Sequence, residues 1–269
     1  MKLLLFRYEN KLSYGVMEGD KVQTLSEDAL TKGEYQPAGN PLAQDEIEFN
    51  APIDPPNVCA IGLNYRQHAE ESNNQLPERP LLFLKATSAV TAHNTPIVLP
   101  SIAPDEVDYE GELAVVIGKT ARNVTQEQAS DYILGYTCAN DVSARDCQLR
   151  YDGQWARGKS FDTFCPLGPW LETDLDPSDL AIQTRVNGKT MQDSRTSDMI
   201  FDCFYIVSFL SHCMTLYPGT VILTGTPSGV GGARKPPVFL QEGDQVEVEI
   251  EGVGTLKNHV RSSCSAATS

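Results

Sequence analysis

The sequence predicts a mainly β protein with peripheral helices, which is an α+β fold class. Short alternating or β-branched apolar runs, separated by turn residues, recur along the chain and indicate many short strands. Few segments have helical spacing, and the longest of them is residues 200–214. The pair Asn187-Gly188 is the strongest short hairpin signal, because it favours the tight turn that joins two antiparallel strands.

Residues 1–54 are expected to form a small, β-rich N-terminal domain. The adjacent prolines Pro55-Pro56 stop regular structure and mark its boundary. Residues 55–261 are then expected to form the main domain, and the polar segment 262–269 a disordered tail. Strands of the N-terminal domain are predicted at residues 2–7, 13–17 and 21–24.

The main domain is expected to contain many strands and few helices. Helices are predicted at residues 64–71, from Thr125 onward with this threonine as N-cap, and at residues 200–214. Strands are predicted at residues 57–61, 81–85, 108–118, 132–139, 180–186, 189–192, 221–223 and 245–250.

Composition excludes several classes of protein. The 269 residues are enough to bury the core of one large domain with a small appendage. No apolar run reaches the ~18 residues that a membrane-spanning helix needs. A formal net charge of −15 argues against nucleic acids and anionic membranes as partners. An anionic substrate would therefore need locally placed cations or a metal ion.

The seven cysteines are widely spread and include no Cys-x-x-Cys, so neither a zinc cage nor a redox pair is indicated. Several lie in apolar runs and are expected to be buried thiols of a reducing compartment. The N-terminus lacks the long apolar region of a signal peptide and the arginines of a transit peptide. We therefore expect a cytoplasmic protein, or one of the mitochondrial matrix if the source is eukaryotic.

Two carboxylates, Glu110 and Glu112, lie two residues apart at the start of an apolar, β-branched run. In a strand such residues point to the same face, and like charges so close are costly unless they are protonated or bridged by a metal. Asp141, at the end of the next apolar run, offers a third carboxylate. An all-oxygen trio suits a hard divalent ion such as Mg²⁺, while the alternative is a pair of solvated side chains on an exposed strand.

His68 and Glu71 are three residues apart on a predicted helix and share a face. A carboxylate beside an imidazole orients the ring and raises its basicity, which makes a general base able to activate water. The alternative is an ordinary surface histidine beside a glutamate.

Three further segments carry polar groups that a substrate could meet. The glycine-rich segment 224–232 follows a strand, and its N–H groups and threonine hydroxyls could hold a carboxylate or simply form a tight surface loop. Arg145 and Gln148 follow Asp141 closely. Lys159 lies among small and aromatic residues and is either a salt-bridged structural residue or a group near the substrate or metal.

Taken together, these segments resemble the fumarylacetoacetate hydrolase family, over about residues 57–260. The resemblance is to its short branch, which holds acylpyruvase, oxaloacetate decarboxylase and 2-hydroxyhepta-2,4-diene-1,7-dioate isomerase-like proteins. Six ordered blocks carry it: G-x-N-Y-x-x-H (62–68), F-L-K-x-x-S-A (83–89), D-Y-E-x-E-L-A-V-V-I-G (108–118), N-D-V-S-A-R-D (140–146), G-K-S-F-D-T-F-C-P-L-G-P (158–169) and I-L-T-G-T-P-x-G-V-G (222–231).

The resemblance implies a mixed β-roll or sandwich with a small N-terminal domain, assembled as a homodimer. It also implies roles for residues of this sequence. Glu110, Glu112 and Asp141 match the ligands of Mg²⁺ or Mn²⁺, and His68 with Glu71 matches a catalytic dyad on a mobile lid. Lys159 is expected to assist catalysis. Contacts to the substrate are expected from Lys85, Arg145, Gln148, Gly225 and Thr226.

The implied activity is that of a divalent-metal-dependent enzyme acting on 2-oxo or 1,3-dicarbonyl acids through a metal-stabilised enolate. Our first expectation is C–C bond hydrolysis of an acylpyruvate-type substrate, with His68 activating water. Oxaloacetate decarboxylation, keto–enol tautomerisation and 2-hydroxyhepta-2,4-diene-1,7-dioate isomerisation use the same enolate and stay open. An inactive family member that binds a small anionic oxo acid is the non-enzymatic alternative.

Overall fold

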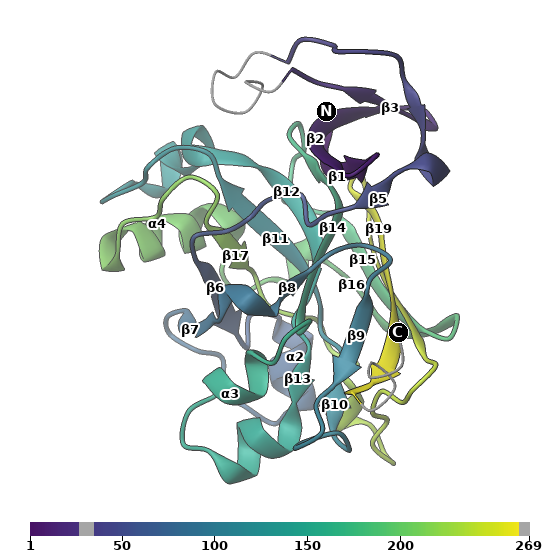
Figure 1. The fold of residues 1–269 in the computed structure, drawn as a ribbon. Helices are drawn as coiled ribbons and strands as arrows, with labels where there is room; N and C mark the ends of the chain where they lie inside the picture. Colours follow the sequence, from purple (N-terminus) through teal and green to yellow (C-terminus); the bar gives the residue numbers. More distant parts are fainter. Residues whose placement is uncertain (27–34, 264–269) are drawn as a thin grey trace.

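The computed structural model describes residues 1–26 and 35–263. Strands make up most of its regular structure and the helices lie at the periphery, which confirms the predicted fold class (Figure 1). Among the described residues, no helix combines the length and the apolar character needed to span a membrane.

The bounds of the elements follow the chain. The N-terminal strands are β1 (Lys2–Tyr8), β2 (Lys11–Glu18), β3 (Lys21–Thr24), β4 (Leu42–Ala43) and β5 (Glu48–Phe49). The later strands are β6 (Val58–Gly62), β7 (Leu81–Lys85), β8 (Val90–Thr91), β9 (Pro96–Leu99), β10 (Val107–Asp108), β11 (Gly111–Ile117), β12 (Ile133–Asn140), β13 (Ser143–Ala144), β14 (Cys165–Glu172), β15 (Ala181–Val186), β16 (Lys189–Arg195), β17 (Val221–Leu223), β18 (Gln245–Ile250) and β19 (Gly254–Ser262). The α-helices are α2 (Arg66–Glu71), α3 (Ala156–Lys159) and α4 (Cys203–Cys213).

Within the described residues, the strands form one large sheet, one smaller sheet and a two-stranded ladder. The large sheet has the order β4-β3-β2-β1-β14-β12-β11-β17-β6-β7, with β5 paired to β1 and β8 paired to β14. The smaller sheet has the order β16-β15-β18-β19-β9, and β10 pairs with β13. Strands β11, β12 and β14 of the large sheet contact β15, β18 and β19 of the smaller one, so the two sheets pack face to face.

Strand β11 shows why its sequence is a continuous apolar run rather than an alternating one. Leu113 and Val115 pack in one buried cluster with Val248 of the smaller sheet. Ala114 and Val116, which point the other way, pack in a second buried cluster. A strand that is covered on both faces needs apolar side chains at every position. This places the polar start of β11 at the edge of a rigid core.

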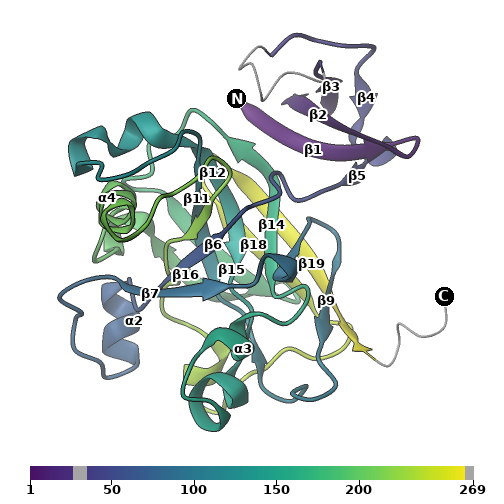
Figure 2. The ribbon, with the colours of Figure 1, turned by 60° about the vertical axis from the view of Figure 1, so that its left-hand side comes forward.

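The N-terminal strands stand to one side of the main body, as Figure 2 shows most clearly. They have a small core of their own, which contains Leu4, Phe6 and Val22. Strand β1 nevertheless joins the large sheet, because Lys2 and Leu3 pair with the end of β14. The boundary at residue 54 stays a prediction.

Several element boundaries differ from the sequence prediction. The strand predicted at residues 108–118 is divided into β10 and β11, and Glu110 lies between them. The segment after Thr125 forms a 3₁₀ helix, Gln126–Tyr132, in place of an α-helix. Helix α4 begins at Cys203, where Asp202 caps it by accepting a hydrogen bond from the Tyr205 N–H at 2.7 Å. Caps of this kind fix where a helix starts.

The predicted hairpin is confirmed, since Asn187-Gly188 joins β15 and β16 with positive φ at both residues. Strand β19 runs through Ser262, one residue into the predicted tail. Residues 264–269 of that tail lie outside the described residues, so the prediction for them stays untested.

Candidate metal and substrate site

Three carboxylates meet where β11 begins and β12 ends. One ligand oxygen from each of Glu110, Glu112 and Asp141 lies within 4.8 Å of the others, and all three residues are buried. The antiparallel register brings them together, because the first residues of β11 pair with the last residues of β12. The convergence that the spacing predicted is therefore present.

Backbone groups hold the three carboxylates in place. The Asp141 N–H donates to the Glu110 carbonyl at 2.8 Å, and the Glu110 N–H donates to the Asn140 side-chain oxygen at 3.0 Å. These bonds continue the pairing where the regular ladder is interrupted. The Glu112 carboxylate accepts from the Gly225 N–H at 2.7 Å. Glu110 thus reaches the site from an irregular link rather than from the strand that was expected.

Lys159, at the end of α3, bridges two of the acids. Its Nζ lies 2.7 Å from Glu110 Oε2 and 2.6 Å from Asp141 Oδ2, and its side chain is 2% exposed. The sequence left open whether this lysine is structural or belongs to the site. The structure places it in the ion-pair network of the acid trio and on the wall of the adjoining pocket.

Lys85, the last residue of β7, lies behind Asp141. Its Nζ donates to Asp141 Oδ1, to the Phe164 carbonyl at 2.9 Å and to the Val142 carbonyl at 3.3 Å. An ammonium group has three donors, so these bonds saturate it. The side chain is also fully buried. The Lys85 ammonium thus meets Asp141 and two backbone carbonyls, and the contact with substrate expected for it stays a prediction.

Arg145 links the acid trio to another buried carboxylate. Its Nη2 lies 2.7 Å from Glu110 Oε1 and 2.8 Å from Asp108 Oδ2, while its Nη1 donates to Gln148 Oε1 at 2.8 Å. Gln148 lies on a single π-helical turn, Cys147–Tyr151. Such turns are rare and often occur at functional sites.

The surroundings shift the pKa values of Glu110 and Glu112 in opposite directions. Burial would raise the pKa of Glu110, but the charges of Lys159 and Arg145 outweigh it and hold that pKa well below its ordinary value. The pKa of Glu112 is raised well above its ordinary value by burial and by repulsion from Asp141 and Glu110. A hard dication among three carboxylate oxygens would oppose that repulsion, so the donor set fits Mg²⁺ or Mn²⁺.

His68 and Glu71 form the predicted pair on α2. Their Nδ1 and Oε2 atoms are 3.2 Å apart, and both Glu71 oxygens accept from the Gly229 N–H at 3.1 Å. Burial alone would raise the pKa of Glu71, but the hydrogen bonds to His68 and to the Gly229 N–H outweigh it and lower that pKa. The carboxylate is therefore ionised. An ionised acceptor requires the proton on His68 Nδ1, which leaves Nε2 as the basic nitrogen.

The four glycine N–H groups of the segment 224–232 are already occupied. Each binds a carboxylate of the protein itself: Gly225 binds Glu112, Gly229 binds Glu71, and Gly231 and Gly232 bind Asp108. The segment therefore binds anions as its composition suggests, but in this structure the anions are side chains. The Gly225 N–H predicted to contact substrate is among these donors.

The backbone of this segment requires glycine at two close approaches. Gly229 has φ +102°, and a Cβ there would lie 2.2 Å from the Met191 carbonyl oxygen. A Cβ at Gly231 would lie 1.9 Å from the Val238 carbonyl oxygen. A side chain is therefore excluded by space at both positions, and at Gly229 also by the positive φ. These positions fix the N–H groups that hold Glu71 and Asp108.

The acid trio and the dyad line one pocket of about 700 Å³. Of the eleven residues that the sequence predicted for the site, all but Lys85 and Gly225 line it: His68, Glu71, Glu110, Glu112, Asp141, Arg145, Gln148, Lys159 and Thr226. The structure thus gathers side chains that are far apart in sequence. The first of them, His68, and the last, Thr226, are separated by nearly 160 residues.

Two residues that hold predicted site residues in place, Asp108 and Gln192, were themselves not predicted. Asp108 is fully buried and accepts bonds from Arg145 and the glycine-rich segment. Gln192 of β16 donates to Thr226 Oγ1 at 2.7 Å and accepts from the Gly111 N–H at 2.9 Å. Asp108 opens the acidic motif and could have been found there. Gln192 lies in a polar strand and carries no signal in the sequence.

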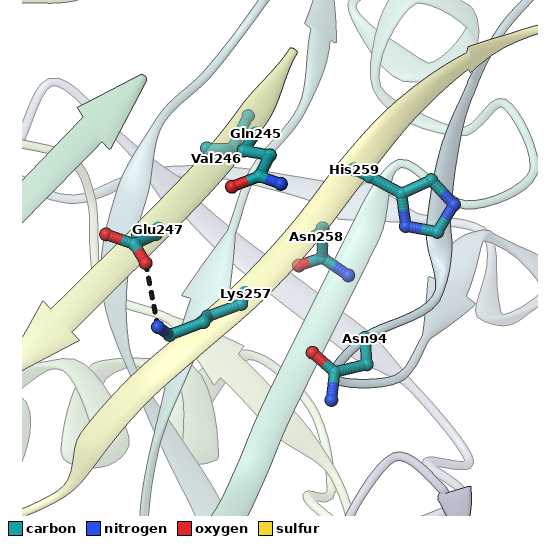
Figure 3. Close-up of a pocket in the computed structure, with 7 residues that line it drawn as sticks. All are labelled: Asn94, Gln245, Val246, Glu247, Lys257, Asn258 and His259. Atoms are coloured by element: carbon teal, nitrogen blue, oxygen red, sulfur yellow. Dashed lines mark ion pairs between the residues drawn. The ribbon is translucent and has the colours of Figure 1, made fainter. Parts of the chain in front are cut away.

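A smaller hollow of about 140 Å³ lies on the outer face of β18 and β19 (Figure 3). Six of its seven lining residues are polar or charged, and the Lys257 and Glu247 side chains form an ion pair at 2.9 Å between these neighbouring strands. It shares no lining residue with the pocket of the acid trio. The hollow therefore lies apart from the predicted chemistry.

Comparison with known proteins gives matches over both parts of the chain. Residues 57–261 match the family model described as Fumarylacetoacetate (FAA) hydrolase C-terminal, and residues 1–52 match the model described as Rv2993c-like, N-terminal. An uncharacterized protein of Archaeoglobus fulgidus is 57% identical over 212 residues, which cover 79% of this chain and 81% of that protein.

Two named proteins are also similar. Oxaloacetate tautomerase Fahd2a, mitochondrial, of Rattus norvegicus is 45% identical over 223 residues, which cover 81% of this chain and 71% of that protein. Among solved structures, that of 5-carboxymethyl-2-hydroxymuconate delta-isomerase from Mycobacterium smegmatis has a TM-score of 0.87 at 44% identity. The superposition covers 97% of this chain and 100% of the other.

Proposed function

Because this chain belongs to the fumarylacetoacetate hydrolase family, we propose that it is a divalent-metal-dependent enzyme acting on 2-oxo acids through an enolate. One observation carries the proposal. The three carboxylates within 4.8 Å of one another share a single pocket with the His68–Glu71 pair. A hard cation site facing a general base is the combination that enolate chemistry needs.

We assign Glu110, Glu112 and Asp141 as the residues that would hold Mg²⁺ or Mn²⁺. When bound, such an ion supplies Lewis-acid polarisation of the 2-oxo oxygen. Lys85 fixes the orientation of Asp141 through its bond to Oδ1. Lys159 contacts two of the acids and also lines the pocket, so its ammonium can meet the carboxylate of a substrate that is held there.

The dyad performs the proton transfer. His68 Nε2 removes a proton from the carbon beside the oxo group, and Glu71 stabilises the imidazolium that results. The Gly229 N–H holds Glu71 in position while this happens. Arg145 and Gln148 are bonded to each other and line the pocket, so they can orient the carboxylate of the substrate.

We propose keto–enol tautomerisation or double-bond isomerisation as the reaction. Both need one base that removes a proton and returns it, which the single dyad can do. The names of two similar proteins, an oxaloacetate tautomerase and a delta-isomerase, support this choice.

Hydrolysis of an acylpyruvate is the second candidate, favoured by the same dyad. The free His68 Nε2, with its partner carboxylate ionised, can take a proton from water as readily as from carbon. The hydroxide would then attack the distal carbonyl, and the C–C bond would break to leave the enolate of pyruvate.

The test follows two substrates in parallel, each with Mg²⁺ and with a chelator. The ultraviolet absorbance of enol-oxaloacetate reports tautomerisation, and pyruvate release from acetylpyruvate or oxaloacetate reports hydrolysis or decarboxylation. We expect chelator-sensitive decay of the enol signal. Pyruvate release from acetylpyruvate alone would favour the hydrolase, release from oxaloacetate alone the decarboxylase, and no metal-dependent change in any assay would contradict the proposal.

The homodimer implied by the family resemblance also stays a proposal. Light scattering of the purified chain would give a molar mass near twice that of one chain if it is correct. A mass near that of a single chain would contradict it.

A further inference from the structure

The pocket beside the acid trio has an aromatic wall. The Phe83 and Trp155 rings meet edge to face, with centroids 5.4 Å apart, and the Phe83 ring lies 5.1 Å from Lys159 Nζ. Lys159 in turn contacts two acids of the trio. The apolar wall therefore begins next to the charged end of the pocket, and Val230 and Phe239 also line the same space.

Each lysine or arginine that lines this pocket in the described part of the chain already has carboxylate partners. Lys159 is paired with Glu110 and Asp141, and Arg145 with Asp108 and Glu110. Arg150, nearer the rim, is paired with Glu106 through two bonds of 2.8 and 2.9 Å. A charge that enters an apolar space without a partner is strongly disfavoured. A second carboxylate at the far end of a substrate would meet such a space.

The pocket is also larger than a four-carbon acid requires. Its volume of about 700 Å³ lies in the range of sites for much larger ligands, roughly 300–1,000 Å³. Leu81 and Leu149 line it and are 46% and 66% exposed. A substrate with an apolar arm would cover these side chains, and covering apolar surface favours binding.

From these contacts we infer that the part of the pocket lined by Leu81, Phe83, Leu149 and Trp155, its outer half, is a subsite for an uncharged, apolar arm. The preferred substrate is then a 2-oxo acid with one carboxylate at the metal end and an alkyl or aryl group beyond the reacting carbons, and a dicarboxylate such as oxaloacetate is the weaker ligand. This inference rests on the proposed function, which places the 2-oxo carboxylate at the acid trio. Trp155 and Phe83 are the residues that set the specificity.

The test uses two acids of equal carbon number, 2-oxohexanoate and 2-oxoadipate, which differ only in a terminal methyl or carboxylate. Binding to the full chain with Mg²⁺ is followed by tryptophan fluorescence, with pyruvate as the reference that has no arm. The chain has two tryptophans, and only Trp155 lines the pocket. We expect 2-oxohexanoate to bind at least about tenfold more tightly than 2-oxoadipate, a difference of about 1.4 kcal/mol.

Two variants test the wall itself. Trp155→Ala should weaken 2-oxohexanoate about tenfold and leave pyruvate nearly unchanged, as measured by calorimetry. Leu149→Lys places an unpaired cation in the outer half, so it should shift the preference toward 2-oxoadipate about tenfold. Ile102→Lys is the matched control, because Ile102 is 69% exposed and does not line this pocket.

Equal or tighter binding of 2-oxoadipate by the unmodified chain would overturn the inference. Loss of that binding in Arg150→Gln would then identify Arg150 as the reader of a second carboxylate. Equal binding of pyruvate and 2-oxohexanoate would also overturn it, because it would show that the outer half makes no contact. The proposed function fails separately, when the binding preference holds but no 2-oxo acid is enolised in a metal-dependent way.

Discussion

The substitution Asp108→Asn tests how the site is built. Asp108 is 0% exposed, and its two oxygens accept hydrogen bonds from four groups and form one further ion contact. Oδ1 accepts from the Tyr109 and Gly231 N–H groups at 2.8 Å. Oδ2 accepts from the Gly232 N–H at 2.8 Å and from Arg145 Nε–H at 2.9 Å, and Arg145 Nη2 lies 2.8 Å from it as an ion contact. Asparagine keeps the shape but presents an NH₂ group to one of these sets of donors.

The expected decrease in the free energy of unfolding follows from those contacts. Breaking a buried ion pair by removing one charge costs about 3–5 kcal/mol, because the remaining charge is left without a partner. Arg145 keeps its bonds to Glu110 and Gln148, so we expect a value near the lower end, about 3 kcal/mol. For a chain of this size each kcal/mol lowers the melting temperature by about 2–4 °C, so the expected decrease is about 6–12 °C.

The matched control is Glu106→Gln, which removes a carboxylate that pairs through both of its oxygens with an arginine at the surface. Arg150 and Glu106 are 51% and 28% exposed, so their pair contributes no more than about 1 kcal/mol. Urea unfolding followed by circular dichroism gives both values. If the losses in unfolding free energy of the two variants differ by less than about 0.5 kcal/mol, the buried contacts of Asp108 contribute no more than a surface ion pair, and the reasoning is wrong.

Three further predictions concern the metal, the base and pH. Glu112→Gln should weaken Mn²⁺ binding by at least about 100-fold in calorimetry, since one of three ligands is lost; unchanged affinity would remove Glu112 from the ion site. His68→Gln should lower turnover by about 10²–10⁴-fold and leave Mn²⁺ affinity intact, whereas His259→Gln should change neither. Burial, aided by a neighbouring lysine, lowers the pKa of His93 from 6.5 to about 4. The stability that comes from burying neutral His93 is therefore complete above pH 6.5 and is lost as pH falls toward 4. His93→Asn should flatten the decline in unfolding free energy between pH 7 and 5. An unaltered slope of that decline, measured by urea titrations, would contradict this.

The acid trio could be predicted from sequence because it depends on local spacing. Glu110 and Glu112 are two residues apart at the start of β11, and Asp141 directly follows β12, the strand that pairs with β11. The same holds for His68 and Glu71, which one helical turn brings together. Family resemblance then assigned roles that spacing alone left open.

The cations of the site depend on tertiary packing and were harder to place. Lys85 lies at the end of a strand whose sequence gives no sign that its ammonium will bind Asp141 and two backbone carbonyls. The anions that the glycine-rich segment binds were also hidden. They come from Asp108, Glu112 and Glu71, which lie more than 100 residues earlier.

Some strands were missed because their sequences oppose the usual preferences. Strand β14 contains two prolines and a glycine, residues that are depleted in strands. It is nevertheless held between β1 and β12, so its neighbours in the sheet override its own propensity. Strand β19 alternates, but its polar residues and its place near the C-terminus masked the pattern.

The central claim is that the acid trio and His68 together enolise a 2-oxo acid. Proton NMR in D₂O measures this directly, as exchange of the C3 protons of 2-oxobutyrate for deuterium. We expect exchange that requires the protein and Mg²⁺, stops with a chelator, and is lost in His68→Gln. Exchange that proceeds at the same rate with and without the protein, or that is unaffected by the chelator, would contradict the account.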